Sequence, residues 1–139
     1  MNKAFIFIAL LSIVAGLAHS TESNDSKLFQ AIAMMEGSTD DRFQNGEVGR
    51  YCITEAFYID GSDYIRKEKG SYPPTHIDMM NPHESRKVII AYWKRYCPKA
   101  YQDKNYLILG AIFRKGPKGY KTATGLDYGN RLTNLMESN

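Results

Sequence analysis

The sequence predicts a mostly helical α+β domain, in which several short helices surround a buried helix and one small β-hairpin is added. Apolar residues recur at helical spacing in several segments, and residues that cap helices precede them. A single tight-turn signal, Asn45-Gly46, lies between two short extended pieces. The 139-residue chain contains no repeat or low-complexity tract, so one domain is expected.

The first predicted helix covers residues 27–36. It follows a capping residue, Asp25 or Ser26, carries apolar side chains at helical spacing, and stops at Gly37. Residues 38–49 are polar and rich in turn-forming residues, and the turn signal within them predicts the hairpin there.

Thr54 is predicted to cap a second helix, residues 55–65, which carries several aromatic side chains. Residues 66–80 contain Gly70 and Pro73-Pro74 and are therefore predicted to form a loop. Because both proline and glycine disfavour a continued helix, the second helix should end before them.

A strong start signal, Asn81-Pro82-His83-Glu84, precedes the third helix, and Pro98 follows its end. The fourth helix is apolar nearly all round and is predicted to be the central buried element. Gly129 interrupts the last helix, at a cost of ~1 kcal/mol relative to alanine. The last three predicted helices are residues 82–96, 106–113 and 126–136.

The N-terminus has the pattern of an export signal. Lys3 precedes an apolar run, residues 4–17, and Ala18-His19-Ser20 places small residues at the two positions that a signal peptidase reads. The run is shorter than the ~20 apolar residues of a membrane-spanning helix. We therefore expect residues 1–20 to be a signal peptide, and residues 21–139 to be a secreted, extracellular domain without stable membrane insertion.

The charge and the cysteine content limit the classes of function that the sequence fits. The net charge of +3 is spread along the chain without a lysine or arginine run, so no nucleic-acid partner is expected. Cys52 and Cys97 are the two cysteines, and in an exported chain such a pair predicts one disulfide, with two buried free thiols as the alternative. Since His76 and His83 lack zinc-site spacing to either cysteine, no metal site is predicted, and no cofactor is implied.

Glu36 is the main candidate for chemistry because it ends an apolar helix segment just before a glycine. A carboxyl group partly withdrawn from water can stay protonated and donate a proton to a leaving oxygen, as glycoside hydrolysis requires. The alternative is an exposed helix-terminal glutamate. The second carboxylate of such a site would come from Asp40, Asp41 or Glu47, each of which could instead be a solvated turn acid.

Six segments in order add to this interpretation: AIAMMEGS (31–38), GRYCI (49–53), AFYID (56–60), AYWKRY (91–96), LGAIFRKGPKG (109–119) and ATGLDYGNRL (123–132). They resemble the invertebrate-type lysozyme (destabilase) family and its cysteine-poor bacterial relatives. The corresponding family patterns include E-S-G, G-Y-F-Q-I or G-P-Y-Q-I, Y-W-x-D, A-Y-M-x-R-Y and A-R-I-H-N-G-G-P-x-G.

The resemblance implies a lysozyme-like fold, with a helical lobe and a small hairpin lobe that flank a saccharide cleft. It also implies cleavage of β-1,4 bonds in peptidoglycan or a chitin-like polysaccharide, an antimicrobial activity, with Glu36 as general acid. Tyr51 and Tyr58 are candidates to stack on sugar rings, with core packing as their alternative. Arg114 could meet an anionic wall polymer, or be a solvated turn residue, and Gly116 matches the family's glycine-rich turn.

The chain departs from the family at the cleft. Cys52 replaces the family's glutamine, the family's H-N-G-G becomes FRKG (113–116), and the stretch after Glu36 is shorter. The second carboxylate is therefore Asp41 or Glu47. Two further functions stay open: a catalytically impaired relative that binds saccharide or a protein partner, and a small secreted structural or toxin-like protein.

Overall fold

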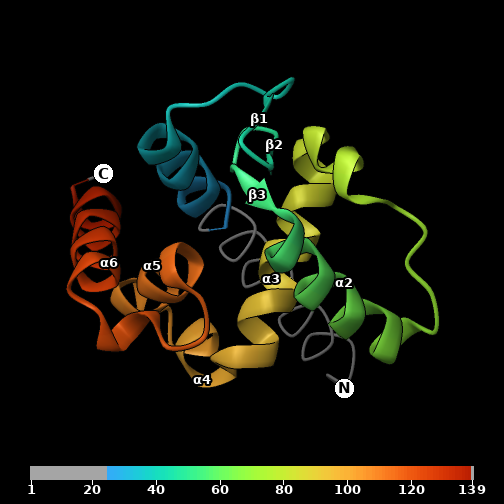
Figure 1. Ribbon diagram of the computed structural model, residues 1–139. Helices are drawn as coiled ribbons and strands as arrows, with labels where there is room; N and C mark the ends of the chain where they lie inside the picture. The colour runs from blue at the N-terminus through green and yellow to red at the C-terminus, as the bar shows by residue number, and fades with distance from the viewer. Residues whose placement is uncertain (1–24, 139) are drawn as a thin grey trace, which may run out of the picture.

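The computed structural model describes residues 25–138, and the predicted signal peptide lies outside this range. The described part is a mostly helical α+β fold with one three-stranded antiparallel sheet (Figure 1), which confirms the predicted fold class. The α-helices are the N-terminal helix (residues 25–36), α2 (Glu55–Lys69), α3 (Pro82–Tyr96), α4 (Pro98–Gln102), α5 (Tyr106–Lys115) and α6 (Ala123–Glu137), with short 3-10 helices η1 (His76–Met80) and η2 (Gly119–Lys121).

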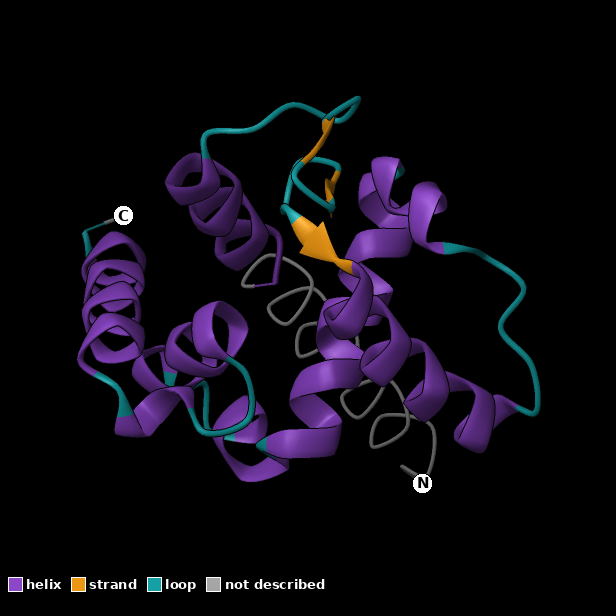
Figure 2. Ribbon diagram, in the orientation of Figure 1, coloured by secondary structure: helices purple, strands orange, loops and turns teal. Residues whose placement is uncertain are grey.

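The predicted hairpin is present as β1 (Phe43–Gln44) and β2 (Glu47–Val48). Asn45 and Gly46 connect them with φ angles of 54° and 75°, values that suit a tight hairpin turn. A third strand, β3 (Ile53–Thr54), pairs antiparallel with β2 and was not predicted. The sheet leads directly into α2, as Figure 2 shows.

The predicted helix caps at Thr54 and Asn81 are confirmed. The Thr54 side chain accepts a hydrogen bond from the backbone N–H of Phe57, and Asn81 accepts one from His83. The loop prediction for residues 66–80 is wrong at both ends, because α2 continues to Lys69 and η1 forms before α3. The helix ends where Gly70 adopts a φ of 80°, as is common at helix C-termini.

Pro98 both follows α3 and begins the short helix α4, which was not predicted. A proline at the first position of a helix loses no intrahelical hydrogen bond, so the same residue can end one helix and start the next. The last helix, α6, begins earlier than predicted, because the Thr122 side chain accepts a hydrogen bond from the Gly125 N–H.

The hydrophobic core centres on α3 and α5. Residues 109–112 of α5 are buried, and Trp93 of α3 is fully buried, with its indole N–H donating to the Leu109 carbonyl at 3.1 Å. Two glycines, Gly110 and Gly129, let α5 and α6 pack closely, since a Cβ atom on Gly129 would lie 2.1 Å from the Leu107 carbonyl oxygen. This contact explains why a glycine interrupts an otherwise regular α6.

Helices lie on both sides of the sheet (Figure 1). η1 ties the sheet to α3, because His76 Nε2 lies 2.7 Å from the Ile53 carbonyl oxygen in β3 and donates to it. The N-terminal helix and α6 lie on the other side of the sheet in Figure 1. Within residues 25–138, no helix has the length and apolar character that crossing a bilayer requires.

Candidate functional site

A cleft of about 500 Å³ opens between the sheet, α2 and the C-terminal end of α5. Its walls come from five separate parts of the chain, so only the folded protein assembles it. The lining residues that bear on chemistry are carboxylates, aromatic rings, the basic last turn of α5 and the glycine that follows it: Glu36, Glu47, Asp60, Phe57, Tyr92, Phe113, Arg114, Lys115 and Gly116.

Glu36 is the last residue of the N-terminal helix and is half-buried at the edge of this cleft. The hydroxyl of Tyr128, from α6, donates a hydrogen bond to Glu36 Oε1 at 2.6 Å. Tyr128 is only 5% exposed, and its pKa is raised by burial first and by the negative charge of Glu36 second. Tyr128 therefore stays protonated and holds one carboxyl oxygen in place.

Of the predicted second carboxylates, the structure brings Glu47 into the cleft. Glu47 lies on β2, and its Oε2 accepts from Arg42 Nη2 at 2.7 Å, with both side chains 27% exposed. Asp41 is exposed, accepts from the Thr39 hydroxyl, and is not a lining residue of the cleft. Glu47, rather than Asp41, is therefore the acid that shares the cleft with Glu36.

A third carboxylate of the cleft, Asp60 on α2, was missed by the sequence reasoning. The Tyr96 hydroxyl donates to Asp60 Oδ2 at 2.9 Å, and Arg95 Nη1 lies 3.6 Å from Oδ1. A signal for it existed, because Asp60 follows Phe57 by three residues and so shares its face of the helix. The hydrogen bond from Tyr96 and the ion pair with Arg95 orient this carboxylate at the α2 side of the cleft.

An aromatic wall runs along the cleft towards Glu36. The rings of Phe57 and Tyr92 stack with centroids 3.9 Å apart and planes 12° apart. Phe113 meets Phe57 edge-on at 5.6 Å and lies 5.9 Å from the ring of Tyr128. Tyr92 is buried, so Phe57 and Phe113 provide the half-buried aromatic surface of this wall. Such a surface beside carboxylates suits an amphipathic ligand such as a sugar, whose ring has apolar C–H faces and a polar rim.

The two tyrosines predicted to stack on sugar are core residues. Tyr51 is 0% exposed, and its hydroxyl accepts a hydrogen bond from Arg86 Nε at 2.9 Å. Tyr58 is buried, stacks on His76 and donates to the Pro74 carbonyl at 2.6 Å. Tyr51 borders the cleft, but neither ring has an exposed face on which a sugar could stack, so the predicted stacking is wrong for both. Arg114 and Gly116 do line the cleft, as predicted.

The predicted disulfide is also wrong, because Cys52 and Cys97 are both free thiols. Cys52 lines the cleft in the turn before β3, whereas Cys97 is buried in the core at the C-cap of α3. Burial is the main cause that raises the pKa of Cys52, and it raises the pKa of Cys97 to about 11. Among residues 25–138, no three His, Cys, Asp or Glu side chains gather in a way that would hold a metal ion.

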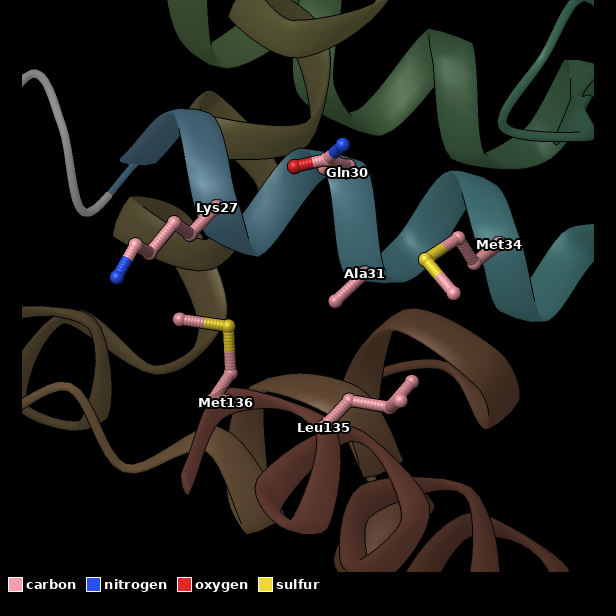
Figure 3. A pocket seen from close by; sticks show the side chains of 6 residues that line it. All are labelled: Lys27, Gln30, Ala31, Met34, Leu135 and Met136. Carbon is pink, nitrogen blue, oxygen red and sulfur yellow. The ribbon is translucent and has the colours of Figure 1, made fainter. Parts of the chain in front are cut away.

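A separate groove of about 320 Å³ lies between the N-terminal helix and α6. Figure 3 shows Ala31 and Met34 from one helix, and Leu135 and Met136 from the other, pointing into the space between them. No carboxylate lines this groove, so it lacks the acid pair of the cleft and is not the candidate site.

Comparison of the chain with protein-family models, with curated proteins and with solved structures gave no match. The function is therefore argued from the residues of the cleft and their geometry.

Proposed function

We propose that the protein is a secreted, lysozyme-like glycoside hydrolase that cleaves β-1,4 bonds in peptidoglycan or a related N-acetylated glycan. The observation that carries the proposal is the fixed position of Glu36, held by buried Tyr128 at the edge of a cleft that also contains Glu47 and an aromatic wall. Most glycoside hydrolases use two carboxyl groups that flank the bond, and this cleft, which is large enough for a sugar, contains two such groups.

Glu36 acts as the general acid in this proposal. Tyr128 donates to Oε1, and Oε2 is the oxygen that delivers the proton in this proposal. That proton passes to the glycosidic oxygen as the bond from this oxygen to the sugar's anomeric carbon breaks, and the departing sugar leaves as an alcohol. Water then supplies the new hydroxyl on the anomeric carbon, and the proton that it loses passes to the Glu36 or the Glu47 carboxylate.

Glu47 supplies the second carboxylate. As a negative charge it either stabilises the positive charge that develops on the sugar ring or activates the attacking water. The ion pair with Arg42 holds the side chain in one place at the sheet side of the cleft. Fixed charges that are aimed before the reaction begins cost little reorganisation during it.

The test is clearing of a peptidoglycan suspension by the chain of residues 21–139, with Glu36→Gln beside it. The parent should clear the suspension, and the nearly isosteric variant should fold but lose all clearing. Asp41→Asn is the matched control, because Asp41 is exposed and outside the cleft, and it should retain parental activity. A Glu36→Gln protein as active as the parent would remove Glu36 from the mechanism.

A second candidate function is saccharide binding without hydrolysis. The observation that favours it is the Arg42–Glu47 ion pair, which already engages the second carboxylate at 2.7 Å. In this case neither parent nor Glu36→Gln clears the suspension, and both sediment with insoluble peptidoglycan or chitin. Loss of sedimentation on Phe57→Ala would place that binding in the cleft.

A further inference from the structure

Arg86 occupies an unusual position on α3. Its Nε donates to the buried Tyr51 hydroxyl at 2.9 Å, and its guanidinium lies over the Phe29 ring, with Cζ 5.4 Å from the ring centroid. These two contacts fix the plane of the guanidinium. Among the residues that the structure describes, Arg86 has no carboxylate within ion-pair distance.

Arg86 lines a hollow of about 690 Å³, which lies beside the N-terminal helix and shares Tyr51 with the cleft. The hollow also contains Arg50 and Asp40, which neutralise each other through two hydrogen bonds of 2.7 and 3.1 Å. Its lining therefore keeps one net positive charge, that of Arg86. Hydroxyl groups and an amide complete the polar part of the lining: Ser26, Ser38, Thr39 and Gln30.

We propose that this hollow, here named the arginine hollow, binds an oxyanion, either a carboxylate or a phosphate, through Arg86. Arg86 is only partly exposed and has no counter-ion among the described residues, and a bound oxyanion supplies one. The planar guanidinium matches two oxygens of a carboxylate or phosphate at once. Tyr51 accepts the hydrogen bond from Nε, and the Phe29 ring covers one face of the guanidinium. The two terminal nitrogens are left for the ligand.

The two sources of an oxyanion are separated by the choice of probe. N-acetyl-alanyl-alanine is the probe with a peptide carboxylate, and glycerol phosphate is the probe with a phosphate. The C-terminal amide of N-acetyl-alanyl-alanine is the uncharged control, since it lacks only the carboxylate charge. Each is titrated into the ¹⁵N-labelled chain while the Nε–Hε signal of Arg86 is followed. None of the probes contains a glycosidic bond, so the result is independent of whether the cleft hydrolyses glycans.

The expected result is saturable binding of at least one anionic probe, with a shifted Arg86 signal and binding at least about tenfold weaker for the amide. Arg86→Lys keeps the charge but loses the planar fork, and should weaken binding about tenfold. Arg66→Gln is the matched control, because Arg66 pairs with Asp63 on α2 outside the hollow, and it should bind as the parent does.

Arg86→Gln removes the charge and should abolish binding of the anionic probes. If the loss of the Tyr51 contact keeps Arg86→Gln from folding, Arg86→Lys takes its place. Two outcomes overturn the proposal: an Arg86 signal that no anionic probe moves at millimolar concentration, or binding that Arg86→Lys leaves unchanged.

Discussion

At the scale of single residues, the account depends on one hydrogen bond between distant parts of the chain. Glu36 and Tyr128 lie on the first and last described helices, and their side chains meet at 2.6 Å. The donor is buried and the acceptor half-buried, so the bond is shielded from competing water. Such a bond stabilises the fold and restricts the carboxyl group to one orientation.

Tyr128→Phe removes the hydroxyl and keeps the ring that packs against Phe113. We expect the free energy of unfolding to fall by about 1 kcal/mol and peptidoglycan clearing to slow by about tenfold, because Glu36 is then free to turn. Denaturant unfolding and turbidity assays measure the two effects. Tyr120→Phe is the control, since Tyr120 is 41% exposed, and equal losses in both variants would contradict the positioning role.

The cysteines give a second residue-scale prediction. In guanidinium without reductant, thiol titration should find two free thiols, because the structure pairs neither cysteine. In the native protein at neutral pH, Cys52 should react slowly and Cys97 not at all, because Cys97 is buried with a pKa of about 11. Zero thiols in the denatured protein would mean that the disulfide forms.

At the scale of elements, the close contact between α5 and α6 positions Tyr128. Gly110 and Gly129 face each other, and a Cβ on Gly110 would lie 2.9 Å from the Gly129 Cα. Because Tyr128 precedes Gly129, the approach of the two helices sets where the tyrosine hydroxyl meets Glu36. Glycine is a poor helix former, and this close packing offsets the helix stability that is lost at Gly129.

Gly129→Ala should destabilise the protein by about 1–3 kcal/mol, despite the better helix propensity of alanine, because the new methyl group would collide with the Leu107 carbonyl. Asn130→Ala is the control, since Asn130 is exposed on the same helix, and it should stabilise the protein by no more than about 0.7 kcal/mol. Thermal unfolding of both variants measures this. A more stable Gly129→Ala protein would contradict the close packing.

The short helix η1 has a pH-dependent cap. The Asp78 carboxylate accepts from the Thr75 backbone N–H at 2.6 Å and hydroxyl at 2.8 Å, which lowers its pKa. The lowered pKa means that this stabilisation is fully present above the unfolded-state value, about 3.9, and is lost as the pH falls through the folded-state value.

Asp78→Asn removes the charge and keeps the shape. The melting temperature of the variant should lie below that of the parent at pH 7, and the difference should shrink as the pH falls from there through the lowered folded-state pKa of Asp78, where the carboxyl of the parent becomes neutral as well. Melting temperatures across this range test the cap. A difference that grows as the pH falls would contradict it.

At the scale of the whole molecule, the features that were predicted correctly from the sequence are those that local interactions determine. The caps at Thr54 and Asn81 and the Asn45-Gly46 turn act within a few residues, so their signals are readable along the chain. β3 was missed because its two residues are defined only by pairing with β2. The cysteine pairing was wrong because sequence separation does not report the distance between two side chains in the fold.

The residues of the candidate site also fall into those that local sequence features predict and those that only the fold reveals. Glu36 was predicted because its place at a helix end is a local feature, and Glu47 was one of two open alternatives until the fold placed it in the cleft. Tyr128 and Asp60 were not recognised as site residues, because their roles depend on partners that are distant in sequence. The two tyrosines that turned out to be core residues carry no local sign of burial.

The central claim is that the cleft breaks glycosidic bonds with Glu36 as the acid. The most direct measurement is the release of reducing sugar ends from purified peptidoglycan by the chain of residues 21–139, compared with Glu36→Gln. The account predicts reducing ends from the parent, none from the variant, and no new amino groups from either. Reducing ends released equally by both proteins, or none from a folded parent, would contradict it.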